Sequence, residues 1–181
     1  ADNDTFLRLW NEVNFNKLGL KYQSTEDTQD KSFKWFPYNK GGQFQKWYGN
    51  LDFVVNWWND GYDIKTDKLT KLKNGLCLES NSKPKNTQYY FREAVTWTDI
   101  STSSFGARIQ PQGCVFDVSG SCLFSNDTVY YLSFMNSKLN FYFLKLLNPT
   151  LHFQVGNIKS IPIIFPNSKE IKQQIETTAQ Q

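Results

Sequence analysis

Apolar and polar positions repeat along this 181-residue chain with two different periods, which predicts a domain that mixes helices and strands. Helical spacing is present over residues 5–14, 63–73 and 127–147. The longest of these has Asp127 or Thr128 as its cap and Asn148-Pro149 as its stop. We also predict a helical turn at 156–160 and a last helix from Asn167 or Ser168 to about Thr177.

Short β-rich runs fill the space between these helices. The predicted strands are 33–36, 43–48, 52–58, 88–97, 105–110, 114–118, 122–124 and 151–155. Turn signals separate several of them, at Asn59-Asp60-Gly61, Pro111-Gln112-Gly113 and Ser119-Gly120. Two prolines keep 161–166 extended. We therefore predict an α+β fold in which a twisted β-sheet is flanked by helices.

Composition supports one ordered domain over 1–181. Hydrophobic residues make up 39% and aromatic residues 17%, which is enough for a sizeable core. The chain begins within a helical pattern at Ala1 and ends at Gln181, so we expect a piece of a longer protein, with 167–181 as the start of a following helix.

Cysteine and histidine usage gives no metal site. The three cysteines form no Cys-x-x-Cys pair and His152 is the one histidine, so free thiols in a reducing cytoplasm are expected. The start of the chain has no signal-peptide pattern, and polar residues interrupt the apolar run 129–147, so no membrane span is predicted.

The distribution of charged residues along the chain is more informative than the net charge. The net charge of +3 is too small to indicate a nucleic-acid binder. Residues 31–51, however, carry four lysines and no acid, whereas 52–100 carries seven of each sign. Within this basic stretch, 34–50 also contains two tryptophans, two tyrosines and the pair Gly41-Gly42. A cationic, aromatic and flexible loop is typical of a surface that binds a polyanion with flat bases.

Each candidate in this loop has an ordinary alternative. Lysines at 34, 40 and 46 suit phosphates, although surface lysines usually point at water. The Gly-Gly pair lets the backbone approach a phosphate, or makes a hairpin turn. The rings of Trp35, Trp47 and Tyr48 stack on bases or pack in the core. Amides suited to adenine edges are Asn39, Gln43 and Gln45.

Further candidates lie in the β-rich middle of the chain. Arg92 and Arg108 are suited to fork onto guanine or clamp a phosphate, with an ion pair to a carboxylate as the alternative for Arg92. Hydroxyl groups that can donate to phosphates follow, in a stretch that is also ordinary loop composition: Thr96, Thr98, Ser101, Thr102, Ser103 and Ser104. A structural role is the default for His152.

The order of several motifs resembles a known family. They include Asp2-Asn3-Asp4 with Phe6 to Trp10, Lys34 to Gly42, Lys46 to Asn50, Phe91 to Ser101, Pro111-Gln112-Gly113, Met135-Asn136-Ser137-Lys138 and Leu147 to Ile158. Together they are similar to the C-terminal target recognition region of the PglX/BrxX family, the adenine-specific DNA methyltransferases of BREX phage-defence systems. Type IIG restriction-modification enzymes are similar over much of this region. The expected architecture is similar to that of the target recognition domains of type I specificity subunits.

The resemblance implies that a parent enzyme methylates adenine N6 from S-adenosylmethionine at a defined DNA sequence, and that this region chooses the sequence by binding duplex DNA. No catalytic residue is expected here. Asn148-Pro149-Thr150-Leu151 lacks the second proline and the aromatic residue of the family's base-holding motif, and no glycine-rich donor loop is present. Both motifs, and the methyl donor, would lie upstream in the parent's methyltransferase domain.

Other function classes remain open. A protein-interaction module would use the aromatic surface to dock another defence protein or a phage inhibitor. A carbohydrate-binding module would stack the same rings on sugars, but the chain has neither a secretion signal nor a disulfide framework. A self-contained enzyme would need an acid–base pair or a nucleophile constellation, which the sequence does not show.

Overall fold

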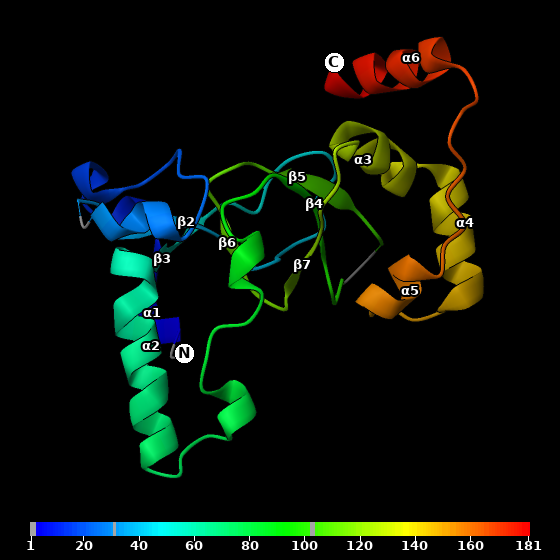
Figure 1. The fold of residues 1–181 in the computed structure, drawn as a ribbon. Helices are drawn as coiled ribbons and strands as arrows, with labels where there is room; N and C mark the ends of the chain where they lie inside the picture. Colours follow the sequence, from blue (N-terminus) through cyan, green and yellow to red (C-terminus); the bar gives the residue numbers. More distant parts are fainter. Residues whose placement is uncertain (1–2, 31, 102–103) are drawn as a thin grey trace. The chain divides into compact units, whose positions relative to one another are not determined.

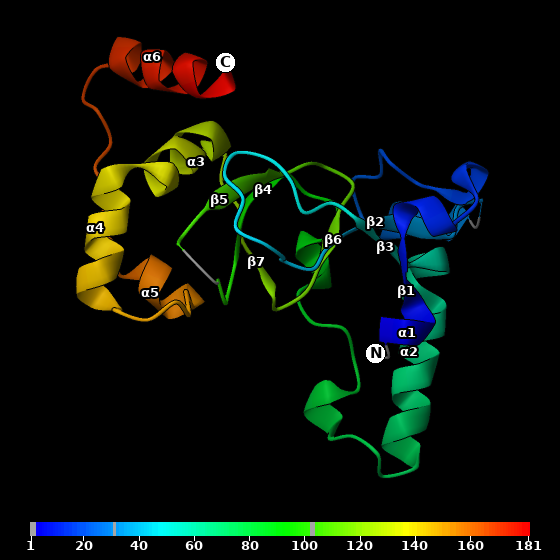
Figure 2. The same cartoon turned by 180° about the vertical axis from the view of Figure 1, so that it is seen from behind.

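The computed structural model describes residues 3–30, 32–101 and 104–181 (Figures 1 and 2). They form two compact units, each assembled from separate stretches of the chain. Unit 1 comprises Ala1–Asn39, Leu51–Arg92 and Pro111–Val115, and unit 2 comprises Lys40–Asn50, Glu93–Gln110 and Phe116–Gln181. Helices and strands occur in both units, which confirms the predicted α+β class, with two small sheets in place of the one expected. A single domain over 1–181 stays a prediction.

Unit 1 is built on a sheet with the strand order β1–β3–β2–β6. Its strands are β1 (Leu7–Leu9), β2 (Trp35–Asn39), β3 (Phe53–Asn56) and β6 (Val115–Phe116), and the division between the units falls within β6, after Val115. Both β1 and β2 pair antiparallel with β3. The β-branched residues Val54 and Val55 are each 3% exposed, so β3 is apolar on both faces, as expected for a central strand.

The predicted helix over 5–14 is wrong. Only α1 (Asn3–Phe6) is helical, and the chain continues as β1 and a 3-10 turn, η1 (Trp10–Glu12). Leu7 pairs with Val55 and Leu9 with Phe53, so the apolar residues serve a sheet rather than a helix face. Pairing with a buried strand outweighs helical spacing in such a short segment.

The turn signal before the second helix is confirmed. α2 (Trp58–Lys73) starts with three residues in left-handed conformation, Asn59, Asp60 and Gly61, with φ of 48°, 57° and 68°. Thr28 fixes this turn because its hydroxyl accepts a hydrogen bond from the Asp60 backbone N–H at 2.9 Å. The predicted helix 63–73 follows. Unit 1 also contains short 3-10 turns: η2 (Phe15–Lys17), η3 (Glu26–Asp30), η4 (Glu79–Asn81) and η5 (Thr87–Tyr89).

Unit 2 is built on an antiparallel sheet with the order β5–β4–β7. The strands are β4 (Ala94–Thr98), β5 (Ala107–Gln110) and β7 (Gly120–Leu123), and the helices are α3 (Thr128–Asn136), α4 (Lys138–Leu147), α5 (Val155–Lys159) and α6 (Lys169–Gln180). In Figure 1, α3, α4 and α5 lie on one side of this sheet. The core joins the two layers and includes Val95, Trp97, Ala107, Leu132 and Leu144.

The single helix predicted over 127–147 is wrong, because the structure has two. Ser137 is extended (φ −72°, ψ 156°) and its hydroxyl accepts a hydrogen bond from the Asn140 N–H at 3.1 Å, which starts α4. The Asn140 amide donates to the Met135 carbonyl at 2.7 Å and stabilises the break. The stop at Asn148, the turn at 156–160 and the last helix are confirmed.

Two predicted strands are also wrong. Residues 43–48 and 151–155, all of them described, make only single bridges, Trp47 to Arg108 and Ile100 to His152. Each segment is joined to its neighbour by a few backbone hydrogen bonds at one point. Its β-rich composition therefore corresponds to a single point of contact rather than to a strand.

Candidate nucleic-acid interface

The loop Lys40–Asn50 lies in unit 2 and is attached to β5. The Trp47 N–H donates to the Ala107 carbonyl at 2.8 Å, and the Ile109 N–H donates to the Trp47 carbonyl at 2.9 Å. The Asn50 amide closes the loop by donating to the Gln43 carbonyl at 2.8 Å. The structure therefore holds one group of predicted contacts on a single fixed loop: Lys40, Gly41, Gly42, Gln43, Lys46 and Trp47.

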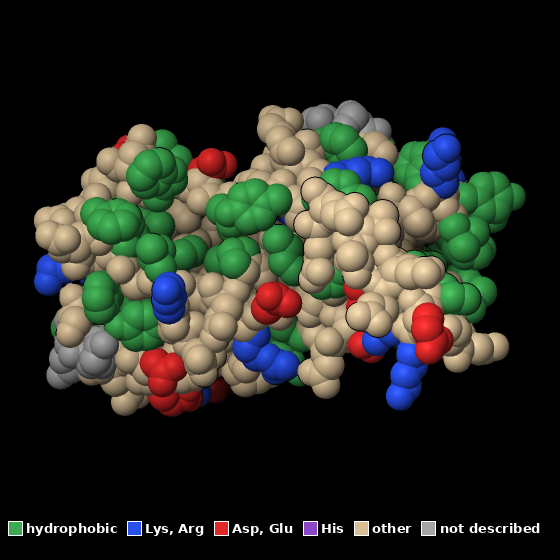
Figure 3. All heavy atoms as spheres, turned by 90° about the horizontal axis from the view of Figure 1, so that it is seen from above, with side chains coloured by type: hydrophobic (Ala, Val, Ile, Leu, Met, Phe, Trp, Pro, Cys, Tyr) green, Lys and Arg blue, Asp and Glu red, His purple; other side chains and the backbone are tan. Residues whose placement is uncertain are grey.

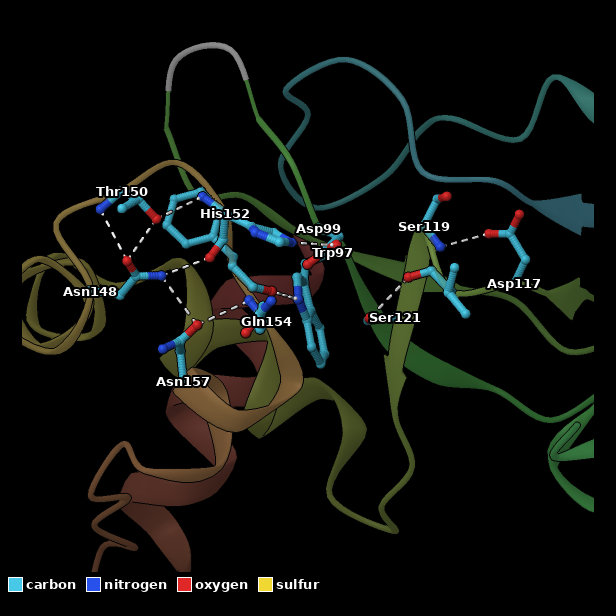
Figure 4. Close-up of polar contacts among 12 residues, drawn as sticks. Trp97, Asp99, Asp117, Ser119, Ser121, Asn148, Thr150, His152, Gln154 and Asn157 are labelled. Carbon is cyan, nitrogen blue, oxygen red and sulfur yellow. Dashed lines mark hydrogen bonds and ion pairs between the residues drawn. The ribbon is translucent and has the colours of Figure 1, made fainter. Parts of the chain in front are cut away.

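Gly41 is required by a close approach. Its φ is +77°, and a Cβ there would lie 2.5 Å from the Ser119 carbonyl oxygen and 3.5 Å from Thr98 Cγ2. The Ser119 turn is itself fixed, because its N–H donates to the Asp117 carboxylate at 2.8 Å (Figure 4). Gly41 is buried and packs against the protein, which supports the turn interpretation; Gly42, with φ of +135°, is exposed.

The outer part of this loop faces solvent. Gln43 and Lys46 are exposed, Lys40 is half-buried, and the rings of Trp47 and Tyr48 are 43% and 62% exposed. The core interpretation of a tryptophan fits Trp57 and Trp97 instead, at 2% and 1% exposed. Rings and polar side chains of the loop are thus available to a ligand.

Asn136 holds the same loop from α3, and it was not among the contacts predicted from the sequence. Its side-chain oxygen accepts from the Ala107 N–H at 3.0 Å, its amide donates to the Ala107 carbonyl at 2.9 Å, and its own carbonyl accepts from the Lys46 ammonium at 3.3 Å. The sequence predicted one unbroken helix through Asn136 to residue 147, and that prediction gave no sign that the Asn136 side chain would bind the backbone of β5.

Three other predicted DNA contacts lie in unit 1: Lys34, Asn39 and Arg92. Lys34 is exposed, with its ammonium 5.6 Å from the centre of the Trp35 ring. Arg92 is exposed and its guanidinium lies 5.6 Å from the centre of the Tyr89 ring. Asn39 is 1% exposed, so its amide faces the interior.

Thr96, Thr98 and Arg108 lie on the face of the β5–β4–β7 sheet opposite the apolar core, where Thr96 pairs with Arg108. Arg108 is 1% exposed, and among the described residues its Nε and Nη2 have no hydrogen-bond partner, as is true of the Thr98 hydroxyl. Burial lowers the pKa of the Arg108 guanidinium, while Cys122 acts in the opposite direction. Contact of Arg108 with DNA stays a prediction that requires the guanidinium to be uncovered.

His152 belongs to a structural clasp at the end of β4 (Figure 4), and the backbone of Ser101 is hydrogen-bonded to the same loop. The His152 Nε2 lies 2.9 Å from the Asp99 carboxylate, and the buried Ser101 donates its N–H to the Leu151 carbonyl at 3.0 Å. Asn148 is the centre of the clasp: its amide donates to the His152 carbonyl at 2.7 Å and its oxygen accepts from the Thr150 N–H at 3.0 Å. Thr102 and Ser103 lie outside the described residues.

The three cysteines are free, as predicted. Within 3–30, 32–101 and 104–181, no cluster of His, Cys, Asp and Glu is arranged to hold a metal ion. None of the described helices has the length and apolar composition needed to cross a membrane. Hydrophobic side chains are exposed at several places on the face in Figure 3, where lysines and arginines are interspersed with acids.

No family model matches the chain. It is 38% identical over 180 residues to a Lacticaseibacillus casei (strain Zhang) protein described as adenine-specific methyltransferase PglX, covering 98% of this chain and 14% of that protein. It is 36% identical over 172 residues to adenine-specific methyltransferase BrxX of Escherichia coli O9:H4 (strain HS), covering 92% of this chain and 13% of that protein. The similarity to PglX and BrxX expected from the motifs is confirmed, and the chain spans only a small part of these relatives.

Proposed function

We propose that this chain, similar to two adenine-specific methyltransferases, is the DNA target recognition part of a longer adenine-N6 DNA methyltransferase. The observation that carries the proposal is the match over 98% of the chain to only 14% of a methyltransferase. A region of this size that carries no catalytic motif of its own suits a specificity role. The methyl donor, S-adenosylmethionine, would bind elsewhere in the parent, with no cofactor in this region.

The structure of the Asn-Pro motif supports a non-catalytic role. Asn148 ends α4, and both ends of its amide are engaged by His152 and Thr150 of its own loop. An amide that holds a flipped base would need those groups free for the base. The motif is therefore accounted for by the clasp.

The proposed DNA contacts divide by chemistry. Lysines set the position along the phosphate backbone, with Lys46 on the fixed loop and Lys34 beside Trp35 in unit 1. Gln43 and Arg92, both exposed, would read base edges, and a good bidentate contact is worth about 1–3 kcal/mol. Trp47 offers a ring for stacking.

A segment exchange tests the proposal. The region corresponding to residues 1–181 would be exchanged between the parent enzyme and a relative that methylates a different sequence, and the methylated adenines of the host mapped by methylation-sensitive sequencing. We expect the methylated motif to follow the exchanged region. A methylated motif that stays with the remainder of the enzyme would contradict the proposal. Either a BREX or a type IIG parent, in the cytoplasm, is compatible with it.

A second candidate is a protein-interaction module for other defence proteins or a phage inhibitor. The observation that favours it is the outer face of α4, where Leu139, Tyr142 and Leu146 are 48%, 60% and 66% exposed at helical spacing. Partner binding that is insensitive to salt and lost in Tyr142→Ser would favour this candidate, whereas DNA binding weakens steeply as salt rises.

A further inference from the structure

A cavity of about 240 Å³ lies in unit 2, where the loop Lys40–Asn50 meets the break between α3 and α4. Its lining includes the exposed Lys46 and Lys138, the half-buried Ser137 and Phe141, and the buried Phe105 and Met135. The cavity is therefore cationic and polar at its exposed side and apolar within. No function assigned above uses this combination.

The two lysines come from different elements and converge on the same space. The Lys46 ammonium lies 3.3 Å from the Asn136 carbonyl, and Asn136 is fixed to the Ala107 backbone, so this charge is held beside the cavity. Lys138 is the first residue of α4 and is exposed. None of the described residues in the lining is Asp or Glu, so the charged side chains that line it are both positive.

The interior restricts the ligand further. Phe105 and Met135 are 3% and 2% exposed, and Phe105 is supported edge-on by Phe153 with ring centres 5.2 Å apart. An inorganic anion would leave this apolar wall without a partner, whereas a sugar or base would cover it. The volume is below the roughly 300–1,000 Å³ of pockets for drug-sized ligands, which suits one nucleotide unit.

We propose that this cavity binds one nucleotide of the DNA, with its phosphate between the ammonium groups of Lys46 and Lys138 and its sugar and base carbons against Phe105, Met135 and Phe141. This rests on the proposed function and specifies where unit 2 holds the DNA backbone. Lys138, which was not among the contacts predicted from the sequence, becomes a DNA-binding residue, and Lys46 acts through the same phosphate.

Met135 is the single methionine of the sequence and gives a direct probe of the cavity. The chain labelled with methyl-¹³C methionine would be titrated with a short duplex, with deoxyadenosine monophosphate and with inorganic phosphate. We expect the duplex to give a saturable shift of the Met135 methyl resonance. Lys138→Gln should weaken duplex binding about fivefold or more at low salt and reduce the slope of log K against log salt by about 0.9.

Two variants complete the design. Lys159→Gln, an exposed lysine on α5, is the matched control and should behave as the wild type. Lys46→Gln combined with Lys138→Gln should weaken binding by less than the product of the single effects, because both act on one phosphate. Each variant removes an exposed charge, and an unchanged circular dichroism spectrum and thermal midpoint of the free protein verify its fold.

Three outcomes would overturn the inference, and they are distinguishable. Duplex binding seen by fluorescence anisotropy with an unmoved Met135 resonance rejects the cavity and leaves the proposed function standing. Absence of any salt-dependent duplex binding by the wild type rejects the proposed function as well. A shift produced by the mononucleotide or by phosphate, but not by the duplex, rejects DNA as the source of the phosphate.

Discussion

Gly41 illustrates how one residue fixes the candidate loop. Its positive φ excludes most side chains, and so does the 2.5 Å separation that a Cβ at this position would have from the Ser119 carbonyl oxygen. We expect Gly41→Ala to lower the free energy of unfolding by more than about 1 kcal/mol, measured by urea denaturation. Gly75→Ala is the control, because Gly75 has φ of +68° with nothing within 4 Å. An equal loss in both variants would show that backbone conformation, not the close approach, sets the cost.

Arg108 shows what a sequence cannot indicate about one residue. An arginine in a strand without a nearby acid looks like a contact for DNA, but whether the side chain is covered depends on segments far away in the chain. Its guanidinium is buried with Nε and Nη2 unpaired among the described residues. A buried guanidinium whose N–H groups are only partly paired costs stability.

We therefore expect Arg108→Met to leave the free energy of unfolding unchanged or raise it by about 1–4 kcal/mol in urea denaturation. Because burial lowers the pKa of Arg108 in the folded state, the cost is present at every pH below that pKa and is relieved only above it. Thr96→Val, on the paired residue of β4, is a neighbouring control for a general change of this face. A clear destabilisation by Arg108→Met alone would contradict the expectation.

At the scale of elements, segments with a clear local signal were predictable and those set by tertiary contacts were not. The sequence signal for β3 is a β-branched run, and the signal for α2 is a turn followed by helical spacing. The signal for α6 is the Ser168 cap. β1 requires knowledge of its partner β3. The break between α3 and α4 depends on the capping hydrogen bond of Ser137. In the sequence, the long apolar pattern across this point is a stronger signal than a single serine, so one continuous helix was predicted.

α6 gives a prediction with a defined pH range. Lys172 on α6 pairs with Asp127 at the start of α3, and this hydrogen bond raises the pKa of Lys172. A raised pKa in the folded state means that the contribution is complete below about pH 10.4, the unfolded value, and is lost as pH rises through the folded value. We expect urea denaturation to show wild type and Lys172→Gln converging as the pH rises above about 10.4.

Lys169→Gln is the control for this test, because Lys169 is exposed on the same helix. Its difference from the wild type should not change with pH over this range. A constant gap between wild type and Lys172→Gln would show that the ion pair does not hold α6 to α3.

At the scale of the whole molecule, the basic stretch 34–50 is divided by the fold. The sequence presents it as one loop, but Lys34 and Asn39 belong to unit 1 and Lys40 to Asn50 to unit 2. Of the contacts predicted in this stretch, Gly42, Gln43, Lys46 and Trp47 are exposed, whereas Asn39 is buried because of its place in β2. Their contact with DNA stays a prediction.

The same division predicts the outcome of truncation. Residues 93–181 contain the sheet and helices of unit 2 but lack Lys40–Asn50, which supplies the backbone hydrogen bonds of Trp47 to β5. We expect this truncated chain to lose cooperative thermal unfolding in circular dichroism. Residues 1–166, which lack only α6 and the segment before it, are the control and should retain it. Cooperative unfolding of 93–181 would contradict the expectation.

For the proposed target recognition role, the interleaved path of the chain bears on how sequence specificity can be inherited. Since the polypeptide passes back and forth between the two units, no single recombination breakpoint separates one from the other. A gene that acquires only half of this region would encode units whose packed segments come from two different parent proteins. Under this proposed role, new target preferences should therefore arise by exchange of the entire segment, or by point changes confined to exposed loops.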